Sequence, residues 1–167
     1  LFFFLFIISF FRIPNRTLTI NDNQIICPAD GKVVVIEDAE ELRGKINDFS
    51  IVQWLSNTPY PYDLGDAISF INRSNQSIKD STAYNLVIEI EGEIAGGVGL
   101  FDVNEVGGEL GFWIASKFWK RGIATEASKT MLYFGFRQLE LKTIKASFKE
   151  GNEASNKVLK KLGFMSV

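Results

Sequence analysis

Between Glu37 and Leu55, apolar residues recur every three to five positions, which is the spacing of one buried helix face. The pattern breaks at residues 47–48, so it predicts a helix or a helix pair that ends before Thr58. Asp63 is a suitable cap for a second helix. The polar residues of 72–82 predict a loop after that helix.

The rest of the chain alternates apolar runs with turn residues. A tight turn precedes a β-branched strand over residues 32–36. Further on, the pattern predicts strands over 85–90, 94–101 and 108–115, a helix over about 125–139, a strand over 143–148 and a helix over 152–162. Hairpins between consecutive strands form an antiparallel meander, so the expected fold is α/β (α+β), with a mixed, mainly antiparallel sheet flanked by helices.

Composition removes several kinds of active site. The 167 residues include no histidine and one cysteine, Cys27. A Ser-His-Asp or Cys-His nucleophile system, a His-ligated metal and an intrachain disulfide are therefore excluded. We expect no metal site, and any proton transfer must use carboxylates, phenols, water or backbone groups.

The first eleven residues, Leu1–Phe11, are apolar apart from Ser9. This run is shorter than the roughly 20 residues that a membrane-spanning helix needs. It lacks the basic region and cleavage site of a signal peptide, and no Met precedes it, so we expect the chain to begin inside a longer product. A buried strand or helix is one interpretation; a membrane-surface anchor or the stump of a transmembrane helix is the other.

Charge is divided unevenly along the chain. Residues 1–116 carry 7 basic and 16 acidic residues, whereas residues 117–167 carry 11 basic and 4 acidic residues. Solvated helix faces would explain this division, and so would a polyanion bound by the last third.

A turn with the sequence FWKRGIATEA, residues 118–127, joins the strand at 108–115 to the following helix. Gly122 allows close backbone approach, and the N-terminus of the helix adds its positive dipole end. The turn therefore predicts a phosphate site, although such joints also occur for purely structural reasons.

Two resemblances divide the chain. Residues 10–37, with the run Pro28–Val33 (PADGKV), resemble the N-terminal segment of phosphatidylserine decarboxylase proenzymes. That family cleaves itself at a Gly-Ser pair and uses histidines; this chain contains neither, so the resemblance does not carry the activity. We expect an N-terminal segment over 1–36 and a second domain over 37–167.

Three segments of the second part, 109–114 (ELGFWI), 118–127 and 152–164 (NEASNKVLKKLGF), resemble the GNAT acetyltransferase superfamily. They are most similar to its RimJ/RimL branch of ribosomal-protein N-terminal acetyltransferases, and the likeness runs from about 37 to 164. The resemblance implies that acetyl-CoA donates an acetyl group to a primary amine, either a protein N-terminus or a small molecule, by direct attack. It implies no nucleic-acid partner and a cytoplasmic location.

The resemblance also implies site residues. Glu109 and Ser155 are the candidate catalytic residues, as base and as proton donor, although an exposed strand carboxylate and a helix cap are the structural alternatives. The candidate acetyl-CoA-binding residues are Phe112, Trp113, Ile114, Lys120, Arg121, Gly122, Ile123, Ala124, Thr125 and Asn152. Tyr60 and Tyr62 are candidates for the acceptor side or for packing.

The family continues with two further strands where this sequence stops, at Val167. We therefore expect a truncated domain with impaired activity and an exposed sheet edge at Thr143–Phe148, which would lead either to low stability or to association through that edge. The alternatives are a non-catalytic CoA- or anion-binding relic with membrane contact through residues 1–11, and an inactive fusion fragment related to the decarboxylase.

Overall fold

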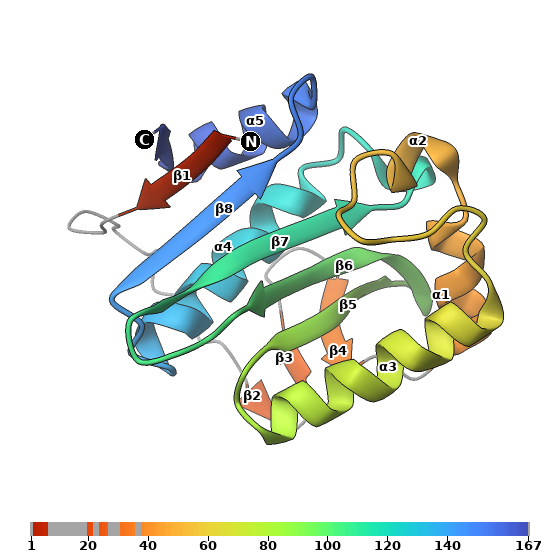
Figure 1. Cartoon of the computed structure of the whole chain (residues 1–167), viewed down its shortest axis with the longest axis horizontal. Helices are drawn as coiled ribbons and strands as arrows, with labels where there is room; N and C mark the ends of the chain where they lie inside the picture. Colours follow the sequence, from red (N-terminus) through yellow and green to blue (C-terminus); the bar gives the residue numbers. More distant parts are fainter. Residues whose placement is uncertain (1, 7–19, 22–23, 27–30, 36–37, 167) are drawn as a thin grey trace.

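The computed structural model describes residues 2–6, 20–21, 24–26, 31–35 and 38–166. These residues form one nine-stranded sheet in the order β2-β3-β4-β5-β6-β7-β8-β1-β9 (Figure 1). The strands are β1 (Phe2–Phe6), β2 (Ile20–Asn21), β3 (Gln24–Ile26), β4 (Gly31–Val35), β5 (Tyr84–Ile90), β6 (Glu93–Phe101), β7 (Gly107–Ile114), β8 (Thr143–Phe148) and β9 (Met165–Ser166). The pair β7–β8 is parallel, and the other neighbouring pairs are antiparallel.

Helices cover both faces of this sheet. They are α1 (Ala39–Ile46), α2 (Phe49–Val52), α3 (Leu64–Lys79), the short 3-10 helix η1 (Ser116–Phe118), α4 (Ile123–Arg137) and α5 (Glu153–Lys161). Helices α1 to α3 lie on one face, and α4 and α5 on the other (Figure 1). The sequence prediction of a mixed sheet flanked by helices is confirmed.

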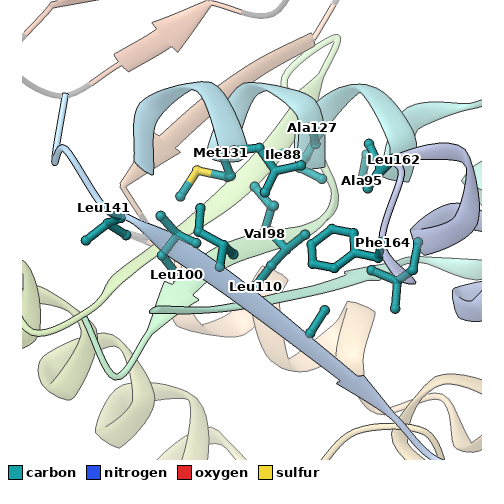
Figure 2. Packing of buried hydrophobic residues seen from close by; sticks show 14 of the residues in the cluster. Ile88, Ala95, Val98, Leu100, Leu110, Ala127, Met131, Leu141, Leu162 and Phe164 are labelled. Carbon is teal, nitrogen blue, oxygen red and sulfur yellow. The ribbon is translucent and has the colours of Figure 1, made fainter. Parts of the chain in front are cut away.

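The larger core lies between the sheet and the α4–α5 layer. Met131 of α4 is fully buried against Leu100 and Leu110 of the central strands (Figure 2). Leu159 and Leu162 extend the same core under α5. A second cluster on the other face includes Leu42 of α1, Val52 of α2, Ala67 and Ile71 of α3, and Val87 of β5.

The predicted loop over 72–82 is wrong, because α3 continues to Lys79. The polar residues of its second half lie on the solvent side of the helix, while Ser74 faces the sheet at 2% exposure. Asp80 ends the helix, and its carboxylate accepts hydrogen bonds from Gln76. Polar composition alone therefore did not indicate a loop.

The predicted exposed edge at Thr143–Phe148 is also wrong. Strand β1 pairs with β8 along its whole length, from Phe2↔Phe148 to Phe6↔Ile144, and β9 pairs with β1 in turn. Of the interpretations given for the apolar run 1–11, residues 2–6 thus form a strand. Residues 7–11, Cys27 and residues 28–30 lie outside the described part of the chain. Strands from 1–36 and from 37–167 share one sheet, and the division into these two parts stays a prediction.

Candidate active site

Strands β7 and β8 separate partway along their length. Their parallel register runs from Gly107↔Thr143 to Leu110↔Ala146. Within the described residues, 111–114 have no register partner in β8, although β7 stays paired with β6 as far as Ile114. The two strands therefore open into a wedge at the carboxyl end of β7.

The backbone of β7 shows which polar groups face this wedge. The N–H of Ala115 donates to Ala95 O on the β6 side (2.9 Å), and Val106 O accepts from Thr143 N on the β8 side (3.2 Å). Because alternate residues of a strand direct both backbone groups to the same neighbour, Phe112 and Ile114 direct theirs toward β8. Trp113 directs its groups toward β6. Ile114 O also accepts from Trp119 Nε1 at 2.7 Å.

The turn before α4 presents backbone donors. Lys120 and Gly122 have positive φ, 62° and 82°, with Arg121 between them at negative φ. Alternation of this kind curves the chain so that successive N–H groups point into one concavity. No side chain caps α4, and the N–H groups of residues 121–124 have no acceptor among the described residues. Thr125 N donates to Gly122 O, which begins the helix.

Basic residues lie in and beside this turn. Lys120 and Arg121 are exposed, and the Arg121 guanidinium lies over the buried Phe118 ring, 5.4 Å from its centroid. Lys117 lies 5.3 Å from the same centroid. The helix dipole and the charges of Lys120 and Arg121 would all favour an anion such as a phosphate at this turn.

Lys117 also belongs to an ion-pair cluster. Its Nζ lies 2.6 Å from Glu93 Oε2, and Lys45 of α1 binds the other carboxylate oxygen. Hydrogen bonds from these two ammonium groups lower the pKa of Glu93 to about 2. The cluster ties α1 and η1 to the start of β6.

Glu109 lies in β7, on the sheet face that packs against α1 to α3. Its neighbour Leu110 points into the α4-side core, so Glu109 points to the opposite face. Ser147 Oγ of β8 donates to Glu109 Oε1 at 2.5 Å. The carboxylate therefore lies across the two strands where they begin to separate.

At the start of α5, Asn152 is the N-cap, and its Oδ1 accepts from Ser155 N at 3.1 Å. The Ser155 hydroxyl is half-buried and has no hydrogen-bond partner among the described residues. Asn156 Oδ1 is buried and unpartnered there as well. Asn156 was not among the candidate residues predicted from the sequence, although it follows Ser155 directly.

The two candidate tyrosines are placed differently. Tyr60 is 55% exposed and contacts the Phe49 ring edge-on, with centroids 5.4 Å apart. Tyr62 is 5% exposed within the core of the α1–α3 face, and burial raises the pKa of its phenol. Tyr60 thus has a surface that can meet a second substrate, whereas Tyr62 packs.

Two features are absent from the described part of the chain. No three His, Cys, Asp or Glu side chains there gather as they would around a metal ion. None of the described helices combines the length and the apolar character needed to cross a membrane.

Solved structures share this fold. The microcin C7 self-immunity acetyltransferase MccE, solved with acetyl-CoA and AMP, has a TM-score of 0.77 at 21% identity and matches 86% of this chain and 83% of that one. The ribosomal L7/L12 acetyltransferase RimL, solved with coenzyme A, has a TM-score of 0.76 at 14% identity, over 83% and 81% of the two chains. The RimJ/RimL-type likeness is confirmed at the level of fold.

Sequence relatives match both parts of the chain. Phosphatidylserine decarboxylase proenzyme of Cytophaga hutchinsonii is 68% identical over 38 residues, 23% of this chain, and the chain spans only 17% of that protein. Spermidine N(1)-acetyltransferase of Escherichia coli K12 is 28% identical over 133 residues, 77% of this chain and 68% of that protein.

The acetyltransferase (GNAT) domain model matches residues 33–165, most of the chain. This stretch holds the β7–β8 wedge, the α4 turn and the start of α5. The chain therefore belongs to the GNAT family of acetyltransferases.

Proposed function

We propose that this protein is an acetyl-CoA-dependent N-acetyltransferase that acetylates a primary amine by direct attack. The observation that carries the proposal is the set of N–H groups at residues 121–124, which have no acceptor among the described residues. They curve around a point beside exposed Lys120 and Arg121, as the pyrophosphate of acetyl-CoA requires. The acyl donor is a substrate of the reaction, and no metal is needed.

The wedge supports the next part of this assignment. Both backbone groups of Phe112 and the N–H of Ile114 lie where β8 has moved away, whereas Ile114 O accepts from Trp119 Nε1. They can pair with the amide-containing pantetheine arm much as a further strand would, with Trp113 holding β7 to β6. A backbone N–H in this position also stabilises negative charge on the thioester oxygen as the amine adds. Asn152 and Ile123 to Thr125, at the starts of α5 and α4, are further proposed contacts for the same molecule.

Glu109 is the proposed base. The acceptor arrives as an ammonium ion and must lose a proton before its nitrogen attacks the thioester carbon. The C–N bond then forms, the nitrogen gives up a second proton through water, the C–S bond breaks, and the departing thiolate takes a proton. The Ser155 hydroxyl, which has no partner in the described residues, is the proposed donor of that proton, and it regains one through water from the amine nitrogen.

The acceptor is a protein N-terminus or a small-molecule amine. RimL is named as an α-N-protein acetyltransferase, and the Escherichia coli relative is named for spermidine, so the relatives support both classes. Tyr60, exposed beside Phe49, is the proposed aromatic contact on the acceptor side. Tyr62, which is buried in the core of the α1–α3 face, would hold the segment that carries Tyr60 in place. The proposed location is the cytoplasm, with membrane contact through residues 1–11 as an alternative.

The test is CoA release from acetyl-CoA with saturating amine. Glu109→Gln should lower kcat about 100-fold or more, the usual contribution of a general base, with little change in acetyl-CoA affinity. Ser155→Ala should lower kcat less, and Glu105→Gln, on the exposed β6–β7 turn, serves as the matched control. Acetyl-CoA binding without turnover would instead support a non-catalytic CoA-binding protein, and no binding would refute the proposed function and leave a structural relic.

A further inference from the structure

Two polar residues of β8 lie beside Glu109 on the α1–α3 face of the sheet. Lys145 is in parallel register with Glu109, and Ser147 is the next residue of β8 on the same face. Because neighbouring strands are only about 4.8 Å apart, the long side chain of Lys145 can reach the Glu109 carboxylate, as the Ser147 hydroxyl does. Glu109 therefore has two possible partners in β8.

The carboxylate pairs with the hydroxyl and not with the ammonium group. Ser147 Oγ donates to Glu109 Oε1 at 2.5 Å. Lys145 is exposed, and no ion pair joins it to Glu109 or to another described residue. Glu109 Oε2 has no hydrogen-bond donor in the described part of the chain. One carboxylate oxygen is thus held, and the other is available to accept a proton.

The choice of partner sets the direction of the carboxylate. Ser147 lies just beyond Ala146, the last residue of β8 in register with β7. Residues on one face of a strand follow each other at about 6.6 Å, so a carboxylate held by Ser147 leans toward the wedge. A carboxylate paired with Lys145 would instead stay beside the closed part of the ladder.

The strand on the other side of β7 offers Glu109 no polar partner. Phe101 of β6 is in register with Glu109, and a Cβ on Gly111 would lie 2.7 Å from the Phe101 ring. This ring covers the sheet beside the carboxylate and carries no hydrogen-bond donor. Within the described sheet, the competition for the carboxylate is therefore between Ser147 and Lys145.

Accepting the proposed function, we propose that Ser147 is a positioning residue for the base. Its hydroxyl holds Glu109 toward the wedge and keeps the carboxylate from pairing with Lys145. Glu109 Oε2 is then in place to accept the proton of the incoming ammonium ion. Ser147 acts through Glu109, and the gain arises because the productive geometry is set before the amine binds.

The test measures CoA release from acetyl-CoA with saturating spermidine or a hexapeptide amide, whichever the wild type turns over faster. Ser147→Ala should lower kcat about tenfold and change the acetyl-CoA affinity by less than about twofold. Ser147→Thr keeps the hydroxyl and should stay within about twofold of the wild type. Thr143→Val is the matched control, because it removes a hydroxyl from the same strand and face, where the partner is Val106 O. Its kcat should stay within about twofold of the wild type.

A second substitution separates orientation of the base from folding. In the Ser147→Ala background, Lys145→Met removes the competing ammonium group and should restore kcat about two- to fivefold, as expected for breaking an exposed ion pair. In the wild type, the same substitution should change kcat by less than about twofold, because Ser147 already holds the carboxylate. A merely structural role of Ser147 would give no such dependence on background.

The other outcomes overturn the proposal in distinguishable ways. An unchanged kcat in Ser147→Ala, with Glu109→Gln impaired, would overturn the role of Ser147 and leave the proposed base in place. Equal losses of kcat in Ser147→Ala and Thr143→Val, or an equal effect of Lys145→Met in both backgrounds, would show a structural role only. An unimpaired Glu109→Gln would refute the proposed base, and a wild type that turned over neither amine would refute the proposed function. Either result would refute the positioning role as well.

Discussion

Replacing Gly122 tests directly whether the turn before α4 binds the phosphates of acetyl-CoA. Its φ is +82°, and a Cβ added there would meet no atom within 4 Å. Gly122→Ala therefore introduces left-handed backbone strain without a clash, about 1–2 kcal/mol. For a chain of this size, such a loss lowers Tm by roughly 2–8 °C. Relaxing the strain also rotates the N–H groups of residues 122–123 away from their common point.

Gly92 is a matched control, because its φ is +80° and its Cβ position is equally open. It lies in the β5–β6 turn and not in the α4 turn. Both alanine variants should lose similar stability in a thermal melt. Only Gly122→Ala should weaken acetyl-CoA binding, roughly tenfold or more by calorimetry, since each lost hydrogen bond to a charged group contributes about 1.5–3 kcal/mol. Equal affinities in the two variants would refute the phosphate assignment.

Three further predictions concern stability. Met131→Ala should lower the free energy of unfolding in urea by about 2–5 kcal/mol, whereas Met165→Ala, at a residue 62% exposed, should change it by less than about 0.5 kcal/mol. The pKa of Glu93 falls from 4.5 to about 2 on folding, so its ion pairs stabilise the protein above pH 4.5 and are lost as the pH falls toward 2. The Tm difference between the wild type and Glu93→Gln should therefore shrink as the pH is lowered from 4.5 to 2. A difference that stays constant over this range would contradict the proposed ion pairs. Leu5→Pro removes a backbone N–H from β1, a strand that pairs with β8 on one side and with β9 on the other. Amide hydrogen exchange should therefore become faster across Thr143–Phe148. Unchanged exchange rates there would contradict the β1–β8 pairing.

The periodicity of apolar residues was sufficient to predict those helices and strands whose buried residues alternate regularly within the element itself. The strand at 143–148 was predicted with its observed limits because Ile144 and Ala146 alternate with polar residues. The second half of α3 was missed, since one buried serine among polar residues carries no apolar signal. The pairing of β1 was not predictable, because it joins residues more than 130 positions apart.

The candidate site divides in the same way. The α4 turn and its donors lie in one short segment, so the residues at 120–125 could be named from sequence. The hydrogen bond from Ser147 to Glu109, by contrast, joins residues 38 positions apart in the chain. It exists because β7 and β8 pair in parallel as far as Ala146. No motif contains both residues, so the sequence alone could not show that the proposed base has this partner.

The place of β1 connects the N-terminal strand to the chemistry. Opening the wedge deprives β8 of β7 as a partner beyond Ala146, which would leave the last residues of β8 poorly held. Strand β1 pairs with those residues, through Phe3↔Ser147 and Phe2↔Phe148. Since Ser147 donates to Glu109, this pairing fixes the hydrogen-bond partner of the proposed base. Strand β1, which lies outside the matched family domain, therefore supports one side of the candidate active site.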